Sequence, residues 1–189
     1  MARFIAITGT HSTGKSTFLQ GLETALLEQT PDLRVARVSD KASDCRDAGF
    51  PILRDHTVDS TLWIMASVIR GELEAALHAD VVLVDRPVSD ALGYLEAAHQ
   101  SRGDAIPKPG REYLYTLARL HSRRYDVVVR TVLDSSIPLG PGRDTDSKFR
   151  ALVDERIEAV VGELGMASIE MRSSGVDERA AEVLGFLAS

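Results

Sequence analysis

The chain contains no asparagine, one cysteine, one tryptophan and few aromatic side chains. Without asparagine it cannot carry the Asn-Lys-x-Asp motif by which switch GTPases recognise guanine. A single cysteine, Cys45, excludes a disulfide within the chain and is typical of proteins from a reducing compartment. No apolar run is long enough to span a bilayer, and the first residues lack an apolar segment of signal-peptide length. We therefore expect a cytoplasmic protein with no membrane partner.

The composition is that of an ordinary globular domain. The chain has 189 residues, of which 44% are hydrophobic and 26% charged, so a single domain over residues 1–189 can bury a sizeable core. The formal net charge is −6. A net negative charge argues against broad binding of nucleic acid through its phosphates. The expected partner is therefore a small molecule.

Apolar, strand-like runs alternate with segments of helical period along the chain. The predicted strands are residues 3–8, 33–38, 81–84, 126–133 and 168–171, and the predicted helices are residues 16–27, 56–78, 89–100, 111–124, 145–164 and 177–187. Strands that alternate with helices form βαβ units and a parallel sheet with helices on both faces. Ligands of such α/β folds bind at the carboxyl ends of the strands.

The first predicted strand runs into a phosphate-binding motif. Residues 9–16, GTHSTGKS, match GxxxxGK[ST] at every defined position, between a strand and a helix as the motif requires. The glycines let the backbone turn its N–H groups inward, and the helix N-terminus adds partial positive charge. This strand–loop–helix pattern predicts a nucleoside-triphosphate site, and the missing guanine motif favours ATP.

Each residue type of the loop has an expected role at the triphosphate. We expect Lys15 to reach the β- and γ-phosphates as a catalytic residue, and Ser16 to bind Mg²⁺ through its hydroxyl. Thr17 is expected to meet the α-phosphate. The remaining predicted ATP-binding residues shape the loop or supply backbone N–H groups: Gly9, His11, Ser12, Thr13 and Gly14.

A second acidic strand end follows the apolar run at residues 81–84. Asp85 comes directly after this run, and Arg86 follows it. The pair resembles the Asp-Arg signature of thymidylate and deoxynucleoside kinases. This resemblance implies two candidate roles for Asp85, as the base that accepts the acceptor's hydroxyl proton or as a group that orients Mg²⁺. Arg86 is expected to stabilise charge on the transferring group and to touch the substrate.

Several segments together resemble one group of small bacterial P-loop kinases. They resemble the nicotinamide-riboside kinase domain of NAD-regulator proteins and, at Asp85-Arg86, the thymidylate and deoxynucleoside kinases. The resembling segments, in order, are GTHSTGKSTF, CRDAGFPI followed by a Trp-bearing helix, VVLVDRPVSDALGY and RDTDSKFR. The resemblance implies an α/β P-loop NTPase fold with a five-stranded parallel sheet in the order 2-3-1-4-5, flanked by helices. It also leaves room for a homodimer.

The same resemblance implies a short arginine-bearing lid at about residues 135–150. Arg143 is its expected catalytic and ATP-binding cation, with Lys148 and Arg150 as further cations. The lid lacks the aromatic-acidic run of the nicotinamide-riboside type, so the acceptor stays open.

The acceptor is expected between the ends of the second and third strands. Asp40 follows the second strand directly, and Arg54 and Trp63 lie on segments that can face the same site. Asp90 either caps its helix or touches the substrate, and the cap is the favoured interpretation.

These features predict an ATP- and Mg²⁺-dependent kinase that transfers the γ-phosphoryl group to a small molecule, preferably a nucleoside or nucleotide-like compound. The alternative is a P-loop ATPase or a nucleotide-dependent regulatory switch without a small-molecule acceptor. A larger AAA-type module has little room in a chain of 189 residues.

Overall fold

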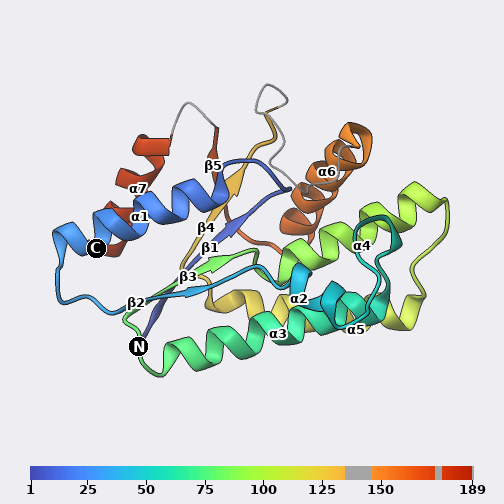
Figure 1. Cartoon of the computed structure of the whole chain (residues 1–189), viewed down its shortest axis with the longest axis horizontal. Helices are drawn as coiled ribbons and strands as arrows, with labels where there is room; N and C mark the ends of the chain where they lie inside the picture. Colours follow the sequence, from blue (N-terminus) through green and yellow to red (C-terminus); the bar gives the residue numbers. More distant parts are fainter. Residues whose placement is uncertain (135–145, 173–175, 189) are drawn as a thin grey trace.

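A five-stranded parallel sheet forms the centre of the computed structural model, which describes residues 1–134, 146–172 and 176–188 (Figure 1). The strand order is β2-β3-β1-β4-β5, which confirms the predicted 2-3-1-4-5 arrangement. The strands are β1 (Arg3–Thr8), β2 (Val35–Val38), β3 (Val81–Asp85), β4 (Val127–Thr131) and β5 (Ile169–Met171). Every neighbouring pair runs parallel, so all the carboxyl ends lie at one edge of the sheet.

Helices cover both faces of the sheet, as the alternation of strands and helices predicted (Figure 1). One face carries α1 (Lys15–Gln29) and α7 (Val176–Ala188), and the other carries α3 (Val58–Ala76), α4 (Val88–Arg102) and α5 (Lys108–His121). The helix α6 (Ser147–Glu163) packs beside α4. None of the described helices is both long and apolar enough to cross a membrane.

The alternation of side chains along each strand explains why the strands are apolar throughout. In β1, Phe4 and Ala6 join the cluster under α3, α4 and α5, whereas Ile5 and Ile7 join the cluster under α1 and α7. A strand buried on both faces has no side that favours polar residues. The continuous apolar runs in the sequence are a direct consequence of this position.

Helices α4 and α6 lie in close contact at Gly93. A Cβ atom at Gly93 would lie 2.4 Å from Cγ1 and 3.0 Å from the Cα of Ile157. The close approach fixes α6 against α4, and α6 begins where the predicted lid ends. Asp146 caps α6, and its side chain accepts hydrogen bonds from the backbone N–H groups of Lys148 and Phe149.

The chain between β2 and α3 departs from the prediction, which placed no helix there. It forms a short helix, α2 (Ala42–Asp47), and a 3-10 turn, η1 (Leu53–Asp55). Both are too short for a helical period to stand out in the sequence. Cys45 on α2 is buried, and its Sγ lies 3.7 Å from the carbonyl oxygen of Ser60 on α3. This contact holds α2 over the carboxyl edge of the sheet.

The predicted lid is described only in part. Residues 135–145, including Arg143, lie outside the described residues, and residues 146–150 form the cap and first turn of α6. A second 3-10 turn, η2 (Ser122–Arg124), follows α5 within the region predicted as one helix. The assignment of residues 1–189 to a single domain stays a prediction.

Candidate active site

The P-loop leaves β1 at Gly9 and enters α1 at Gly14. Gly9 has a φ of 135°, and a Cβ atom there would lie 2.2 Å from Oγ1 and 2.7 Å from the carbonyl oxygen of Thr131 on β4. Gly14 has a φ of 85° and stands directly before the first residue of α1. Both glycines therefore occupy positions where a side chain is strained or excluded. This is the physical reason for the two fixed glycines of the motif.

The Lys15 side chain is buried against the P-loop. Its Nζ donates hydrogen bonds to the carbonyl oxygen of Thr10 and, at 3.3 Å, to Oγ1 of Thr13. Burial, and secondly the nearby Arg86, lower the pKa of Lys15, and with the opposing effect of Asp90 and other carboxylates the result is about 7. The amine bonds neutral oxygens of the loop, and a bound phosphate would favour its charged form.

The other predicted loop residues divide between buried and exposed positions. Thr13 is buried, and its hydroxyl bonds the carbonyl oxygen of Thr10 at 3.0 Å. His11 is also buried, with Nδ1 at 3.2 Å from the Tyr94 hydroxyl. Ser12 is half-buried, while Ser16 and Thr17 are exposed on the first turn of α1. The two exposed hydroxyls are therefore open to a ligand at the helix N-terminus.

Asp85 and Arg86 lie beside the P-loop because β3 pairs with β1. Ile7 is the register partner of Asp85, and the backbone N–H of Arg86 donates to the Ile7 carbonyl at 3.1 Å. Arg86 has a φ of 68°, a left-handed conformation that is uncommon for a non-glycine residue. This bend turns its side chain back toward Gly9, whose carbonyl oxygen it bonds at 3.1 Å.

The Arg86 guanidinium is buried and surrounded by polar partners. It contacts Oδ2 of Asp40 at 2.9 Å, Oδ2 of Asp90 at 3.5 Å and the Tyr94 hydroxyl at 3.5 Å. Burial disfavours the charge, but Tyr94, Asp40 and Asp90 outweigh it and raise the pKa of Arg86. The cation is thus fixed in place beside the P-loop, and Asp40 from β2's end is drawn to the same point.

Asp90 corrects the prediction that it caps its helix. Pro87 occupies the cap position of α4, which has no side-chain cap. The buried Asp90 carboxylate instead accepts hydrogen bonds from the Thr8 hydroxyl and, at 3.3 Å, from the Gly9 backbone N–H. Burial raises the pKa of Asp90 to about 6, against the opposing effect of Arg86 and Lys15. Asp90 therefore ties α4 to the start of the P-loop.

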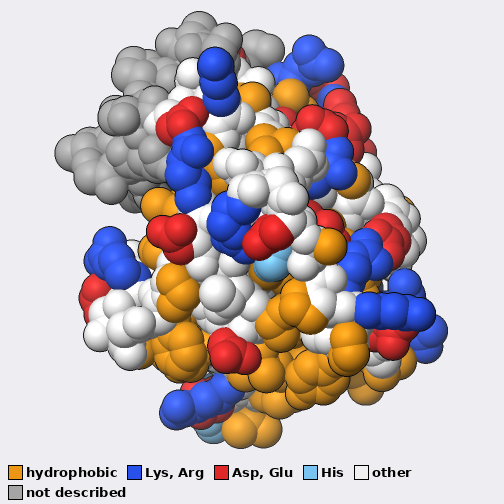
Figure 2. Space-filling model, turned by 90° about the vertical axis from the view of Figure 1, so that its right-hand side faces the viewer, with side chains coloured by type: hydrophobic (Ala, Val, Ile, Leu, Met, Phe, Trp, Pro, Cys, Tyr) orange, Lys and Arg blue, Asp and Glu red, His pale blue; other side chains and the backbone are white. Residues whose placement is uncertain are grey.

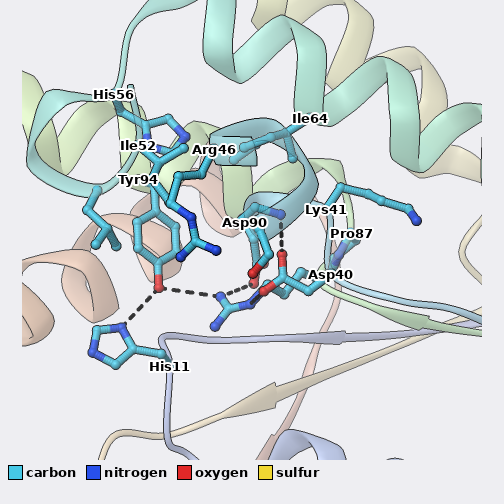
Figure 3. A pocket seen from close by; sticks show the side chains of 15 residues that line it. His11, Asp40, Lys41, Arg46, Ile52, His56, Ile64, Pro87, Asp90 and Tyr94 are labelled. Carbon is cyan, nitrogen blue, oxygen red and sulfur yellow. Dashed lines mark hydrogen bonds and ion pairs between the residues drawn. The ribbon is translucent and has the colours of Figure 1, made fainter. Parts of the chain in front are cut away.

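A pocket opens next to this cluster, between the P-loop, α2, η1 and α4 (Figure 3). Asp40, Arg86, Asp90 and His11 line its polar end, and Ile52 and Ile64 are among its apolar lining residues. Figure 3 shows Tyr94 between the two ends, with its hydroxyl toward His11. The same hydroxyl lies 3.5 Å from Nη1 of Arg86. The pocket lies where the sequence predicted the acceptor.

The remaining two predicted acceptor residues do not line this pocket. Arg54 pairs with the Asp146 carboxylate, and its guanidinium lies 5.0 Å from the centre of the Phe149 ring. Trp63 packs against the core beside Phe50, with ring centres 6.1 Å apart. Both side chains are occupied in contacts between elements of the fold, because α3 and η1 turn them away from the pocket.

Arg150 contacts the P-loop directly, although it lies on α6. The guanidinium donates from Nε to the His11 carbonyl at 3.2 Å and from Nη2 to the Ser12 carbonyl at 2.9 Å. The side chain is buried, so these bonds are shielded from water. Arg150 therefore holds the middle of the loop to α6.

Three residues contribute more to the site than their sequence pattern indicated, namely Asp90, Arg150 and His56. Asp90 follows Arg86 by four residues, so one turn of a helix brings the two together, and this spacing was a usable signal. No comparable signal pointed to Arg150, because its partners are backbone carbonyls far away in the sequence. His56 has no ligand-like spacing, yet it is buried in the wall of the pocket.

The donor set near the P-loop fits a magnesium ion bound together with a nucleotide. Among the described residues, no group of three or more His, Cys, Asp or Glu side chains could hold a metal ion alone. Mg²⁺ at phosphate sites is held by one or two protein oxygens and by the phosphates themselves. The hydroxyl of Ser16 and the carboxylate of Asp85 are oxygen donors of this kind.

The chain is similar in fold to solved structures of NadR proteins and of a thymidylate kinase. A NadR protein in complex with NAD and AMP-PNP matches with a TM-score of 0.72 and 13% identity, over 100% of this chain and 50% of its own. A NadR protein in complex with NR matches with a TM-score of 0.73 and 14% identity, over 100% and 52%. The chain thus spans about half the length of the NadR chains that it matches.

A thymidylate kinase from Ehrlichia chaffeensis matches along almost its entire length. The TM-score is 0.67 and the identity 16%, over 97% of this chain and 98% of that one. At these identities the likeness concerns the fold, which is that of P-loop kinases. No curated protein sequence matches the chain.

A family model described as an AAA domain matches residues 4–179. An AAA-type ATPase module was not expected in a chain of 189 residues. The description of the family and the similar kinase structures therefore suggest different activities. The match covers the strands, the P-loop, the Asp85-Arg86 pair and all the helices up to the start of α7. The chain therefore belongs to this AAA domain family, and it has the fold of P-loop kinases.

Proposed function

We propose that the chain is an ATP-dependent kinase that transfers the γ-phosphoryl group to a small molecule, preferably a nucleoside or nucleotide-like compound. The observation that carries the proposal is the meeting of three features at one edge of the sheet. The P-loop, the Asp85-Arg86 pair and a pocket adjoin one another there. A donor site and an acceptor site side by side are what phosphoryl transfer requires.

In this proposal the P-loop binds the triphosphate and Lys15 moves from the Thr10 carbonyl to the β- and γ-phosphates. Ser16 and Asp85 hold Mg²⁺, which neutralises charge on the phosphates when it is bound. Thr17 meets the α-phosphate, Gly9 shapes the turn into the loop, and His11, Ser12, Thr13 and Gly14 contribute backbone N–H groups. Arg143, in the predicted lid, supplies a further cation.

On the acceptor side, Asp40 and Arg86 bind the substrate at the polar end of the pocket. Asp85 either accepts the proton of the acceptor hydroxyl or orients the metal ion, and both roles stay open. Arg86 stabilises the negative charge that spreads over the transferring group. Its fixed position needs no reorganisation when the charge develops.

A second candidate function is ATP hydrolysis or a regulatory switch without a small-molecule acceptor. The description of the family as an AAA domain favours it. The two candidates differ in one respect, namely whether ADP release depends on an added acceptor.

The experiment that separates them measures ADP release with a panel of nucleosides, nucleotides and amino sugars. A kinase releases ADP well above the rate with water for at least one of these acceptors. If ADP release with every acceptor equals the rate with water alone, the kinase proposal is wrong and the result supports the ATPase function. Lys15→Ala should abolish transfer while the fold persists.

The Asp85→Asn variant tests the chemistry at the strand end. We expect turnover to fall by at least about 100-fold, as for the loss of a base or of a metal-orienting group. The fold should be unchanged, because the amide is nearly the same size as the carboxylate. A rate near that of the unchanged protein would remove Asp85 from the mechanism.

The partners and the location of the protein remain proposals of the same kind. A cytoplasmic kinase without nucleic-acid partners suits the net charge of −6 and the single buried cysteine. Figure 2 shows one side of the molecule, on which apolar side chains gather in the lower half. An apolar surface is compatible with a homodimer, which light scattering of the purified protein would test.

A further inference from the structure

The pocket beside the P-loop contains a buried histidine whose ring has no hydrogen-bond partner among the described residues. His56 is 2% exposed and lines the pocket. Neither Nδ1 nor Nε2 forms a hydrogen bond with any residue that the structure describes. A buried polar group without a partner is costly, so its presence calls for an explanation.

The backbone, by contrast, holds His56 firmly. Its N–H donates to the Leu53 carbonyl at 3.2 Å, and its own carbonyl accepts from Nη2 of Arg102 at 3.3 Å. The ring stacks on Tyr94, with ring centres 5.9 Å apart and an angle of 29° between the planes. These contacts fix the position of the ring and leave its two nitrogens unused.

The ring carries no charge near neutral pH. Burial, and secondly Arg102, lower the pKa of His56, and with the opposing effect of Asp40 and Leu53 the result is about 4. A neutral imidazole offers one N–H donor and one acceptor nitrogen. It therefore suits an uncharged polar group better than a phosphate or a carboxylate.

The surroundings of His56 differ from those of the reaction centre. Tyr94 separates the two, because its hydroxyl bonds His11 of the P-loop while its ring faces His56 (Figure 3). Ile52 and Ile64 also line the pocket. An apolar wall with one neutral hydrogen-bonding group is typical of sites for uncharged heterocycles.

The buried cation of the pocket is already satisfied. Arg86 is paired with both Asp40 and Asp90, so its charge is balanced before any acceptor binds. Lys41 and Arg46 also line the pocket, where Lys41 is half-buried and pairs with Asp44, and Arg46 is exposed and pairs with Asp47. Each of these three cations, among the residues that the structure describes, thus already has a carboxylate partner.

We propose that His56 is a specificity residue that hydrogen-bonds an amide or hydroxyl group on an uncharged heterocycle of the acceptor. The heterocycle lies against the apolar wall and the Tyr94 ring, and the acceptor hydroxyl lies at the polar end beside Arg86. The acceptor class is an uncharged nucleoside rather than a nucleotide. This inference rests on the proposed function for its choice of site, but binding alone can test it.

The test is calorimetric binding of uridine, thymidine, cytidine, adenosine and guanosine, without ATP, with ribose and the 5′-monophosphates as comparisons. At least one nucleoside is expected to bind more tightly than ribose and than its own monophosphate. His56→Phe, which keeps the aromatic ring but removes both nitrogens, should weaken this binding about tenfold or more. His56→Gln keeps a donor and an acceptor and should retain most of it, and the exposed His78→Phe should change nothing.

The stability of the ligand-free protein to urea distinguishes a role of His56 in binding from a role in the fold alone. Because the two ring nitrogens lack partners, His56→Phe should be at least as stable to urea as the unchanged protein. Marked destabilisation of both His56→Phe and His56→Leu would assign His56 to the fold and overturn the proposal. Unchanged nucleoside binding in His56→Phe would also overturn it, as would a chain that binds no nucleoside better than ribose.

The kinase proposal can fail while the inference about His56 stands. If a nucleoside binds and depends on His56, but ATP is hydrolysed at the same rate with or without that nucleoside, the kinase proposal fails and the binding inference stands.

Discussion

Lys15 leads to a quantitative prediction about ATP binding. In the ligand-free protein its pKa is about 7, mainly because the side chain is buried and secondly because Arg86 is close. At pH 8, about nine tenths of the Lys15 side chains are then unprotonated, and at pH 6 about one tenth. A bound triphosphate places several negative charges beside the amine and raises its pKa again. On ATP binding, the Lys15 amine should therefore take up about 0.9 proton at pH 8 and about 0.1 at pH 6.

The proton uptake can be measured by isothermal titration calorimetry in two buffers of different ionisation enthalpy. The difference between the observed binding enthalpies gives the number of protons taken up. By the same linkage, the affinity for ATP should fall by almost tenfold for each pH unit above about pH 8. Lys15→Arg supplies the control, because a guanidinium stays protonated at both pH values.

A binding enthalpy at pH 8 that is independent of the buffer would refute this reasoning. Such a result would mean that Lys15 is already charged in the free protein and that water or a neighbouring carboxylate compensates its burial. An uptake of similar size in Lys15→Arg would instead assign the proton to another group.

Two further predictions concern the loop and its support. Gly9→Ala should destabilise the protein by at least about 2 kcal/mol, since the new Cβ would lie 2.2 Å from Oγ1 of Thr131. In Gly21→Ala, where the site is open, urea unfolding should show a stabilisation of up to about 1 kcal/mol. Arg150→Ala should raise the KM for ATP about tenfold or more, because the loop carbonyls lose their charged donor. Arg156→Ala, on the same helix but without a loop contact, should leave the KM unchanged, and equal effects of both variants would contradict the role given to Arg150.

The order of the elements could be predicted because each depends on local pattern. The apolar run at residues 81–84 and the helical period of residues 56–78 correspond closely to β3 and α3. The strand order needed the family resemblance, because periodicity contains no information on which strands are neighbours. The short elements α2 and η1 escaped prediction, since a helix of one or two turns shows no period.

The candidate site was most predictable where one motif contains all its parts, or where a residue directly follows a strand end, as Asp40 and Arg86 do. The P-loop is such a case, because strand, loop and helix follow one another in the chain. Arg54 and Trp63 show the opposite case. Their residue types suited an acceptor, yet one side chain pairs with Asp146 and the other packs beside Phe50. The direction of a side chain depends on how its helix is rotated against its neighbours, and residue type does not record that.

The strand–loop–helix unit and its chemistry follow from local sequence, because the glycines, Lys15 and Ser16 act over a few consecutive residues. The distant groups that surround this unit depend on how the chain folds as a whole. The pairing of β1 with β3 brings Arg86 to Gly9, and the packing of α6 against α4 brings Arg150 to the P-loop carbonyls. Burial, which leaves Lys15 with a lowered pKa and His56 without a charge, likewise arises only when the whole chain closes around them.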